Sequence, residues 1–264
     1  MKWFESIVFG VVQGVTEFFP VSSSGHLAVL KILFQFEIKK GYLLFDVILH
    51  LATLIAIVIV YWQDILNISR AFLFWKKEKA KERQIGYLLI LATVPGALAG
   101  VFLEDHVETI GFNRYFLSLF FAVTTVFLIT SLFLKKEKYE LHSINWYQAL
   151  LIGVAQAFAV FPGISRSGIT IITGLLLGIK REDAGRFSFL LSIPIILGAV
   201  LFKLKDTESL LQNIGLPNVI LGFVSSLAAG LMALIFLLKL LRKRKLGFFA
   251  AYLIVLIIFL LCFR

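Results

Sequence analysis

Several side chains near the start of the chain could do chemistry, although they lie in an apolar segment. Residues 10–30 read GVVQGVTEFFPVSSSGHLAVL and contain Gln13, Glu17, three serines at 22–24, and His26. Ionisable groups at membrane depth cost about 2.5–3.5 kcal/mol on insertion scales, and they usually line a cavity or a reaction site. Because Gln13 and Glu17 lie four residues apart, on a helix their oxygens share one face and could hold a divalent cation. Mg²⁺ commonly completes its ligand shell with phosphate oxygens, so a substrate phosphate fits this arrangement.

A second polar stretch, FPGISRSG at 161–168, interrupts another apolar segment and carries Arg166. The serines and glycines after each break stand where a half-helix begins, with unpaired backbone N–H groups and a positive dipole end. Two such ends that converge form a site for an anion, and phosphate is the natural occupant. The Arg166 fork adds donors that match phosphate oxygens. We therefore expect the two breaks to form one anion site inside the membrane.

Each of these residues also has a purely structural interpretation. Helix capping explains Ser22 and Ser165 as well as ligand binding does. Glu17 and Arg166 could form an ion pair that only joins the two segments, because structural networks also hold buried charge. For His26 alone, a hydrogen-bonded interior histidine is the ordinary interpretation, which the neighbouring serines and Glu17 reverse. Two further polar residues, Asp46 and His50, are expected to form a local hydrogen-bonded pair or to support the site from behind.

The composition indicates an integral membrane protein. Of 264 residues, 59% are hydrophobic and 16% charged, and the mean hydropathy is +0.93, far outside the range of soluble domains. The net charge of +10 does not indicate nucleic acid, because Lys and Arg cluster in short connections between apolar segments. The single cysteine, Cys262, excludes an intrachain disulfide and a cysteine-based metal site.

The apolar segments predict an all-α polytopic membrane protein with six full transmembrane helices and two re-entrant helical hairpins. The six spans are expected at 43–62, 84–103, 115–134, 187–204, 217–238 and 246–263. The half-helices of the hairpins are expected at 4–18 and 25–36, and at 146–161 and 168–179.

The two hairpins are internal copies. An ungapped shift of 143 lays residues 10–25 on 153–168 with seven of sixteen positions identical, including the glutamine, two serines and two glycines. We therefore expect a single membrane domain, 1–264, made of repeat 1 (about 1–135) and repeat 2 (about 143–264). Three spans separate the hairpins, so the second repeat should be inverted relative to the first, with the broken helices meeting near the bilayer midplane.

The basic residues predict an orientation. This topology places 17 Lys and Arg residues on one face and eight on the other, with Arg166 at a hairpin tip. The positive-inside rule then places 76–83 and 239–247 in the cytoplasm as loops and 104–112 outside. The site near the midplane would open to the outer face.

The stretches QGVTEFFPVSSSGH at 13–26 and FPGISRSGIT at 161–170 resemble the two signatures of the bacterial undecaprenyl-diphosphatase family, the membrane-integral bacitracin-resistance proteins. The resemblance covers essentially the whole chain. It implies an enzyme of the bacterial cytoplasmic (inner) membrane that removes one phosphate from undecaprenyl diphosphate, which recycles the lipid carrier of peptidoglycan synthesis.

The resemblance also implies roles for individual residues. The catalytic set would be Glu17, Ser23, His26 and Arg166, with Mg²⁺ or Ca²⁺ held by Gln13 and Glu17. Gln13 stands where many members have Glu, which weakens a metal site built from two carboxylates. The phosphate-binding set would be Ser22, Ser24, Gly163, Ser165, Arg166, Ser167 and Thr170.

Two mechanistic questions stay open at the level of the sequence. Either Ser23 or an activated water attacks the terminal phosphorus, with His26 transferring protons. The alternative function is a transporter or flippase of a polyprenyl phosphate or a phospholipid, which would use the same inverted repeat without cleaving a bond. The expected partners are the polyprenyl diphosphate substrate and membrane lipids, with no nucleic acid, and a homodimer is left open.

Overall fold

The computed structural model describes residues 1–34, 40–75, 77–110, 113–134, 137–203 and 207–262. Within these ranges the chain is helical and forms no strand, which confirms the predicted all-α class. The helices are α1 (Trp3–Phe18), α2 (Ser23–Leu33), α3 (Lys40–Val60), α4 (Trp62–Phe74), α5 (Ala80–Ile110), α6 (Arg114–Thr130), α7 (Trp146–Phe158), α8 (Arg166–Leu176), α9 (Arg181–Lys203), α10 (Thr207–Asn213), α11 (Leu216–Arg242) and α12 (Gly247–Cys262).

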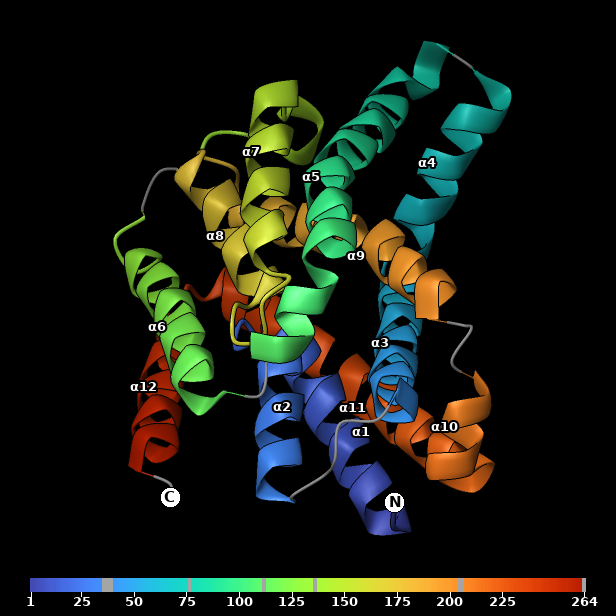
Figure 1. Ribbon diagram of the computed structural model, residues 1–264. Helices are drawn as coiled ribbons and strands as arrows, with labels where there is room; N and C mark the ends of the chain where they lie inside the picture. The colour runs from blue at the N-terminus through green and yellow to red at the C-terminus, as the bar shows by residue number, and fades with distance from the viewer. Residues whose placement is uncertain (35–39, 76, 111–112, 135–136, 204–206, 263–264) are drawn as a thin grey trace.

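The two broken hairpins are present where the sequence predicts them. In Figure 1, α1 and α2 occupy one end of the molecule, α7 and α8 occupy the other, and their tips meet in the middle. Ser22 caps α2 by accepting a hydrogen bond from the amide of Gly25, and Ser165 caps α8 by accepting one from Gly168. The tips touch directly, because the Gly163 amide donates to Ser22 Oγ at 2.9 Å.

Glycine is required where the tips pack. Gly163 has a φ of +105°, and an added Cβ would lie 2.7 Å from the Phe120 side chain and 3.1 Å from the Leu117 carbonyl oxygen. An added Cβ at Gly25 would lie 2.8 Å from the Gly163 amide nitrogen. A side chain at Gly25 would therefore force the two tips apart, and one at Gly163 would collide with α6 and require an unfavourable backbone conformation.

Each expected full span contains one long helix, but the helices differ in length. Residues 35–36, 204 and 263 of the predicted helices lie outside the described residues. Four are long and apolar enough to cross a bilayer: Tyr42–Val60, Lys77–Leu103, Arg181–Phe202 and Leu216–Arg242. The other two, α6 and α12, have 17 and 16 residues. At 1.5 Å per residue they extend about 25 Å, a little less than the hydrocarbon core of about 30 Å. α6 is shorter than predicted because 131–133 forms a turn.

Two predicted connections, the one between the spans expected at 43–62 and 84–103 and the one at 104–112, are largely helical instead, and the prediction of loops there was wrong. The chain forms α4 directly after α3, a 3-10 turn follows at Lys77–Lys79, and α5 begins at Ala80. α5 continues to Ile110, so most of 104–112 is helical, whereas 111–112 lies outside the described residues. At 31 residues α5 is about 46 Å long and extends beyond a bilayer core. The helix-forming sequence AKERQ at 80–84 explains its early start.

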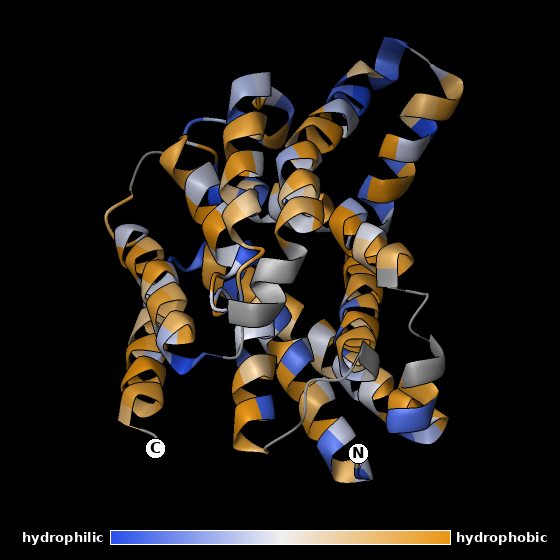
Figure 2. Cartoon of the chain, in the orientation of Figure 1, coloured by the Kyte–Doolittle hydropathy of each residue, from blue (hydrophilic) through white to orange (hydrophobic). Residues whose placement is uncertain are grey.

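The first helix of each hairpin packs across the boundary between the two halves of the chain, which is called exchanged packing below. α1 lies along α11, and α7 lies along α5, so the first helix of each hairpin packs against the other half of the chain. Gly10 and Gly153, which occupy equivalent positions of the two hairpins, both permit this approach: an added Cβ would lie 2.3 Å from the Gly222 carbonyl oxygen and 2.4 Å from that of Ala92. Figure 2 shows long apolar stretches along the helices, with hydrophilic residues concentrated at the α4–α5 end and at a few central positions.

Candidate active site

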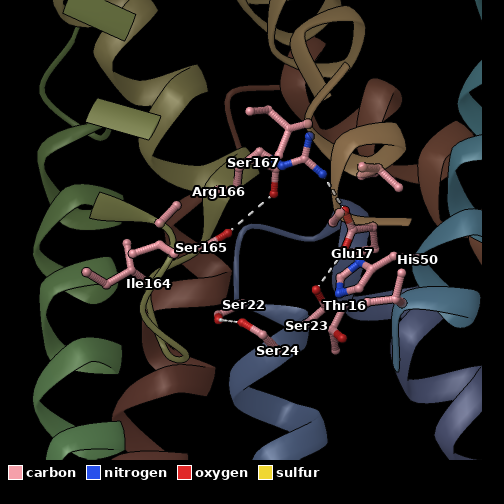
Figure 3. Close-up of a pocket in the computed structure, with 16 residues that line it drawn as sticks. Thr16, Glu17, Ser22, Ser23, Ser24, His50, Ile164, Ser165, Arg166 and Ser167 are labelled. Atoms are coloured by element: carbon pink, nitrogen blue, oxygen red, sulfur yellow. Dashed lines mark hydrogen bonds and ion pairs between the residues drawn. The ribbon is translucent and has the colours of Figure 1, made fainter. Parts of the chain in front are cut away.

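A cavity of ≈ 200 Å³ lies where the hairpin tips meet. Side chains from five helices and both tips line it, and Figure 3 shows the polar ones facing one another. The polar lining consists of Thr16, Glu17, Ser22, Ser23, Ser24, His50, Ser165, Arg166 and Ser167. The apolar lining consists of Val47, Ala159, Val160, Ile164, Ile195, Ile196 and Ala199. A polar centre with an apolar wall suits an amphipathic ligand that carries a charged head group.

Glu17 is the centre of the polar cluster. It lies on the last turn of α1, and its side chain is only 4% exposed. Its Oε2 accepts a hydrogen bond from Ser23 Oγ at 2.6 Å and another from Gln13 Nε2 at 3.0 Å. Because Ser23 is the first residue of α2, the hairpin tip itself brings the hydroxyl to the carboxylate. This arrangement allows Glu17 to take the proton of the Ser23 hydroxyl.

Arg166 joins the second hairpin to the first. It is the first residue of α8, and its Nη2 forms an ion pair with Glu17 Oε1. Its Nη1 is buried and has no hydrogen-bond partner among the described residues. A buried guanidinium nitrogen without a partner is costly, unless a ligand supplies an acceptor. The guanidinium therefore has one arm on the carboxylate and one arm available for a phosphate oxygen.

All the serines at the tips line the cavity, and two of them, Ser22 and Ser165, also cap helices. Ser22 accepts hydrogen bonds from the amides of Gly25 and Gly163, at 3.3 and 2.9 Å, so the capping interpretation holds for it. Ser165 likewise caps α8 through Gly168 at 3.0 Å. Among the described residues, the hydroxyls of Ser24 and Ser167 form hydrogen bonds only with the capping serines, at 3.4 and 3.3 Å. These two hydroxyls are the freer candidates for contact with a ligand.

Four of the expected site residues, Gln13, His26, Gly163 and Thr170, do not line the cavity. Gln13 is buried against Glu17 and His50. His26 turns toward α12: its Nε2 lies 2.8 Å from the Tyr252 hydroxyl, and its Nδ1 lies 2.7 Å from the Ser22 carbonyl oxygen. Thr170 bonds to Ser188 at 2.6 Å, and the Gly163 amide is used by Ser22. The proton-transfer role expected for His26 is therefore not supported by its position, because His26 does not line the cavity and both ring nitrogens already have partners.

His50 belongs to the cluster, which agrees with one of the two expectations for it from the sequence. It lies on α3, lines the cavity, and places Nδ1 3.0 Å from Glu17 Oε2 and 2.8 Å from Gln13 Nε2. Asp46 does not pair with it but forms an ion pair with Lys31 of α2, so the expected local pair was wrong. The one available signal was the spacing of Asp46 and His50, which places both on one face of α3.

The arrangement of Glu17 does not fit a directly bound cation. Both carboxylate oxygens already accept hydrogen bonds, and the groups that contact them are donors or cations: Ser23, Gln13 Nε2, His50 and Arg166. Gln13 Oε1 is buried without a partner among the described residues and is a single remaining oxygen. A Mg²⁺ ion held by Glu17 would lie next to the Arg166 guanidinium and would have to displace these donors. Among the described residues no three His, Cys, Asp or Glu side chains gather as a metal site.

Comparisons with known proteins agree with the two signatures. A family model described as "Bacitracin resistance protein BacA" matches residues 6–259. A protein of Caldicellulosiruptor bescii named undecaprenyl-diphosphatase is 43% identical over 258 residues, which cover 96% of this chain and 94% of the relative. A relative with the same name from Pelotomaculum thermopropionicum is 40% identical, over 96% of this chain and 93% of the relative. Another, from Methanosphaera stadtmanae, is 38% identical, over 94% of this chain and 92% of the relative. The chain belongs to the BacA family of bacitracin resistance proteins.

Proposed function

We propose that this protein is an undecaprenyl-diphosphate phosphatase, which removes the terminal phosphate and returns undecaprenyl phosphate to the lipid-carrier cycle of cell-envelope synthesis. The observation that carries this proposal is the 2.6 Å hydrogen bond from Ser23 Oγ to Glu17 Oε2, opposite the free arm of Arg166. A nucleophile, a base and a phosphate-binding cation share one cavity. The names of the relatives supply the substrate.

In the proposed first step, Glu17 accepts the Ser23 proton while Ser23 Oγ attacks the terminal phosphorus. The Oγ–P bond forms, the bond from phosphorus to the bridging oxygen breaks, and undecaprenyl phosphate leaves. Arg166 Nη1 binds the phosphoryl oxygens, and the first amides of α2 and α8, which lack partners within their helices, add further donors. In the second step a water oxygen attacks the phosphorus, the Oγ–P bond breaks, and Glu17 returns its proton to Ser23 Oγ, which releases inorganic phosphate and restores both residues.

The apolar wall of the cavity accommodates the substrate's isoprenoid end. Val160, Ile164 and Ile195 belong to this apolar lining. Diphosphate and isoprenoid therefore have separate environments in one binding site. The expected Mg²⁺ or Ca²⁺ ion stays a prediction, and no step above depends on it.

We propose that the two halves of the chain are inverted repeats in the bacterial inner membrane, with the site opening to the outer face. The exchanged packing of α1 on α11 and α7 on α5 supports this, as do the direct contacts between the equivalent helices α3 and α9 and between α6 and α12. Contacts between equivalent elements are what a pseudo-two-fold axis produces.

The test is phosphate release from undecaprenyl diphosphate by the purified protein in detergent, with and without EDTA. We expect stoichiometric release of inorganic phosphate and undecaprenyl phosphate. Binding of the lipid without any release of phosphate would favour the transporter or flippase instead. Loss of activity in EDTA that added Mg²⁺ or Ca²⁺ restores would support the cation.

A further inference from the structure

His50 lies outside both signature stretches, yet it contacts the centre of the site. It belongs to α3, which follows the first hairpin, and its side chain is 24% exposed toward the cavity. Three polar atoms form a compact triangle: Glu17 Oε2, Gln13 Nε2 and His50 Nδ1, with sides of 3.0, 2.8 and 3.0 Å. The Ser23 hydroxyl approaches the same Oε2 from α2.

The triangle determines where the ring proton lies. If His50 Nδ1 accepted a hydrogen bond from Gln13, its lone pair would face the lone pairs of Glu17 Oε2 at 3.0 Å, which is repulsive. If Nδ1 carries the proton, both nitrogens donate to the carboxylate, and the 2.8 Å contact between Gln13 Nε2 and Nδ1 is then between two donors that share one acceptor. Because a hydrogen bond to an ionised carboxylate is about twice as strong as a neutral one, the second arrangement is favoured. We therefore expect the Nδ1–H tautomer, in which Oε2 accepts from Gln13, His50 and Ser23 together.

α3 is well suited to hold this contact. Asp46 pairs with Lys31 of α2 one turn before His50 approaches Glu17 of α1, so α3 is attached to both helices of the first hairpin. Thr53 Oγ1 donates to the His50 carbonyl oxygen at 2.8 Å and strengthens the same turn. The ring thus comes from a helix whose rotation is fixed independently of the hairpin tip.

We infer that His50 is a positioning residue, which holds the Glu17 carboxylate so that Oε2 faces the Ser23 hydroxyl. This inference rests on the proposed phosphatase function and adds to it a residue that neither signature contains. Without the Nδ1 donor, Oε2 loses one of its three donors, and the carboxylate is free to rotate toward Arg166. A misplacement of about 1 Å in a reacting group costs about 100-fold in rate.

The kinetic test compares His50→Ala and His50→Asn with the wild type, using release of phosphate. The amide nitrogen of Asn takes about the place of Nδ1, so His50→Asn should keep kcat within about fivefold of the wild type. His50→Ala should lower kcat about 10- to 100-fold, with KM changed less than about twofold. His142→Asn is the matched control, because His142 is exposed in the turn Leu141–Ser143. A normal kcat in His50→Ala would overturn the inference, and so would equal losses in Ala and Asn, since the ring itself would then be needed.

A double variant tests whether His50 acts through Glu17. In a Glu17→Gln background, adding His50→Ala should lower the residual kcat by less than about twofold, because the group that it positions is no longer a base. A further loss as large as that in the single variant would show an independent role and overturn the inference.

A spectroscopic test does not depend on any activity. The chain has four histidines, so the ring nitrogens of His50 can be identified in ¹⁵N NMR spectra as the signals lost in His50→Asn. We expect the shifts of the Nδ1–H tautomer. An Nε2–H ring would overturn the inference even if the wild type is an active phosphatase, and an Nδ1–H ring in a protein that releases no phosphate would refute the proposed function alone.

Discussion

The two arms of Arg166 predict how a lysine at this position would fail. Nη2 is engaged by Glu17, whereas Nη1 is buried and has no partner among the described residues. Lysine keeps the charge but has a single side-chain nitrogen. The ammonium of Arg166→Lys can therefore contact either the Glu17 carboxylate or the phosphate, but it cannot reproduce both contacts. A hydrogen bond to a charged group contributes about 1.5–3 kcal/mol. Since 1.36 kcal/mol is tenfold in rate, kcat should fall about 10- to 150-fold.

The assay is phosphate release across a range of substrate concentrations, on variants that elute as single species in size-exclusion chromatography. If the free arm contacts the phosphoryl group as it is transferred, kcat falls more than KM rises. Arg242→Lys is the matched control, because Arg242 is exposed and its pair with Glu182, at 3.1 Å, is a surface contact.

Two results discriminate between the interpretations of Arg166. A loss of folded Arg166→Ala protein would indicate a structural ion pair with Glu17, since a buried charge left without its partner costs about 3–5 kcal/mol. A folded Arg166→Ala variant with normal kcat would refute the reasoning directly. It would also remove the claim that the two hairpins build one phosphate-binding centre.

Three further predictions concern the base, the caps and the orientation. Glu17→Gln should lower kcat about 10²- to 10⁴-fold without unfolding the protein, because the amide cannot take the Ser23 proton; wild-type turnover would refute this. Ser22→Ala should lower the free energy of unfolding by about 0.5–2 kcal/mol, because Ser22 accepts hydrogen bonds from two buried amides. A fall in the thermal midpoint that is larger for Ser24→Ala than for Ser22→Ala would contradict this prediction. In a Cys262→Ser background, an impermeant thiol reagent on intact cells should label His106→Cys and not Lys79→Cys or Lys243→Cys; the reverse pattern would invert the topology.

The sequence predicted the hairpins well because their signals are local. Proline, glycine and capping serines interrupt apolar helices at the tips, and the structure confirms both breaks near Ser22 and Ser165. The ion pair of Glu17 with Arg166 was one of two interpretations left open, and the two residues do meet. Residues within one segment, or within two copies of it, could therefore be assigned to one site.

What the sequence could not predict depends on how helices rotate against each other. His50 joins the site only because α3 turns one face toward α1, and nothing in the sequence fixes that rotation. His26 lies three residues after Ser23, but the first turn of α2 directs its ring toward Tyr252 instead of the cavity. α4 was missed because its 13 residues mix charged and apolar positions and resemble a connecting loop.

The central claim is that Ser23, activated by Glu17, attacks the terminal phosphate, and one measurement tests it most directly. Wild type and Ser23→Ala are mixed with undecaprenyl diphosphate labelled at the terminal phosphate, quenched in acid during the first turnover, and digested for mass spectrometry. We predict a labelled phosphate on the peptide that contains Ser23, which appears and decays with turnover in the wild type. Ser23→Ala should show neither the label nor significant phosphate release. Phosphate release by Ser23→Ala at the wild-type rate would contradict the account.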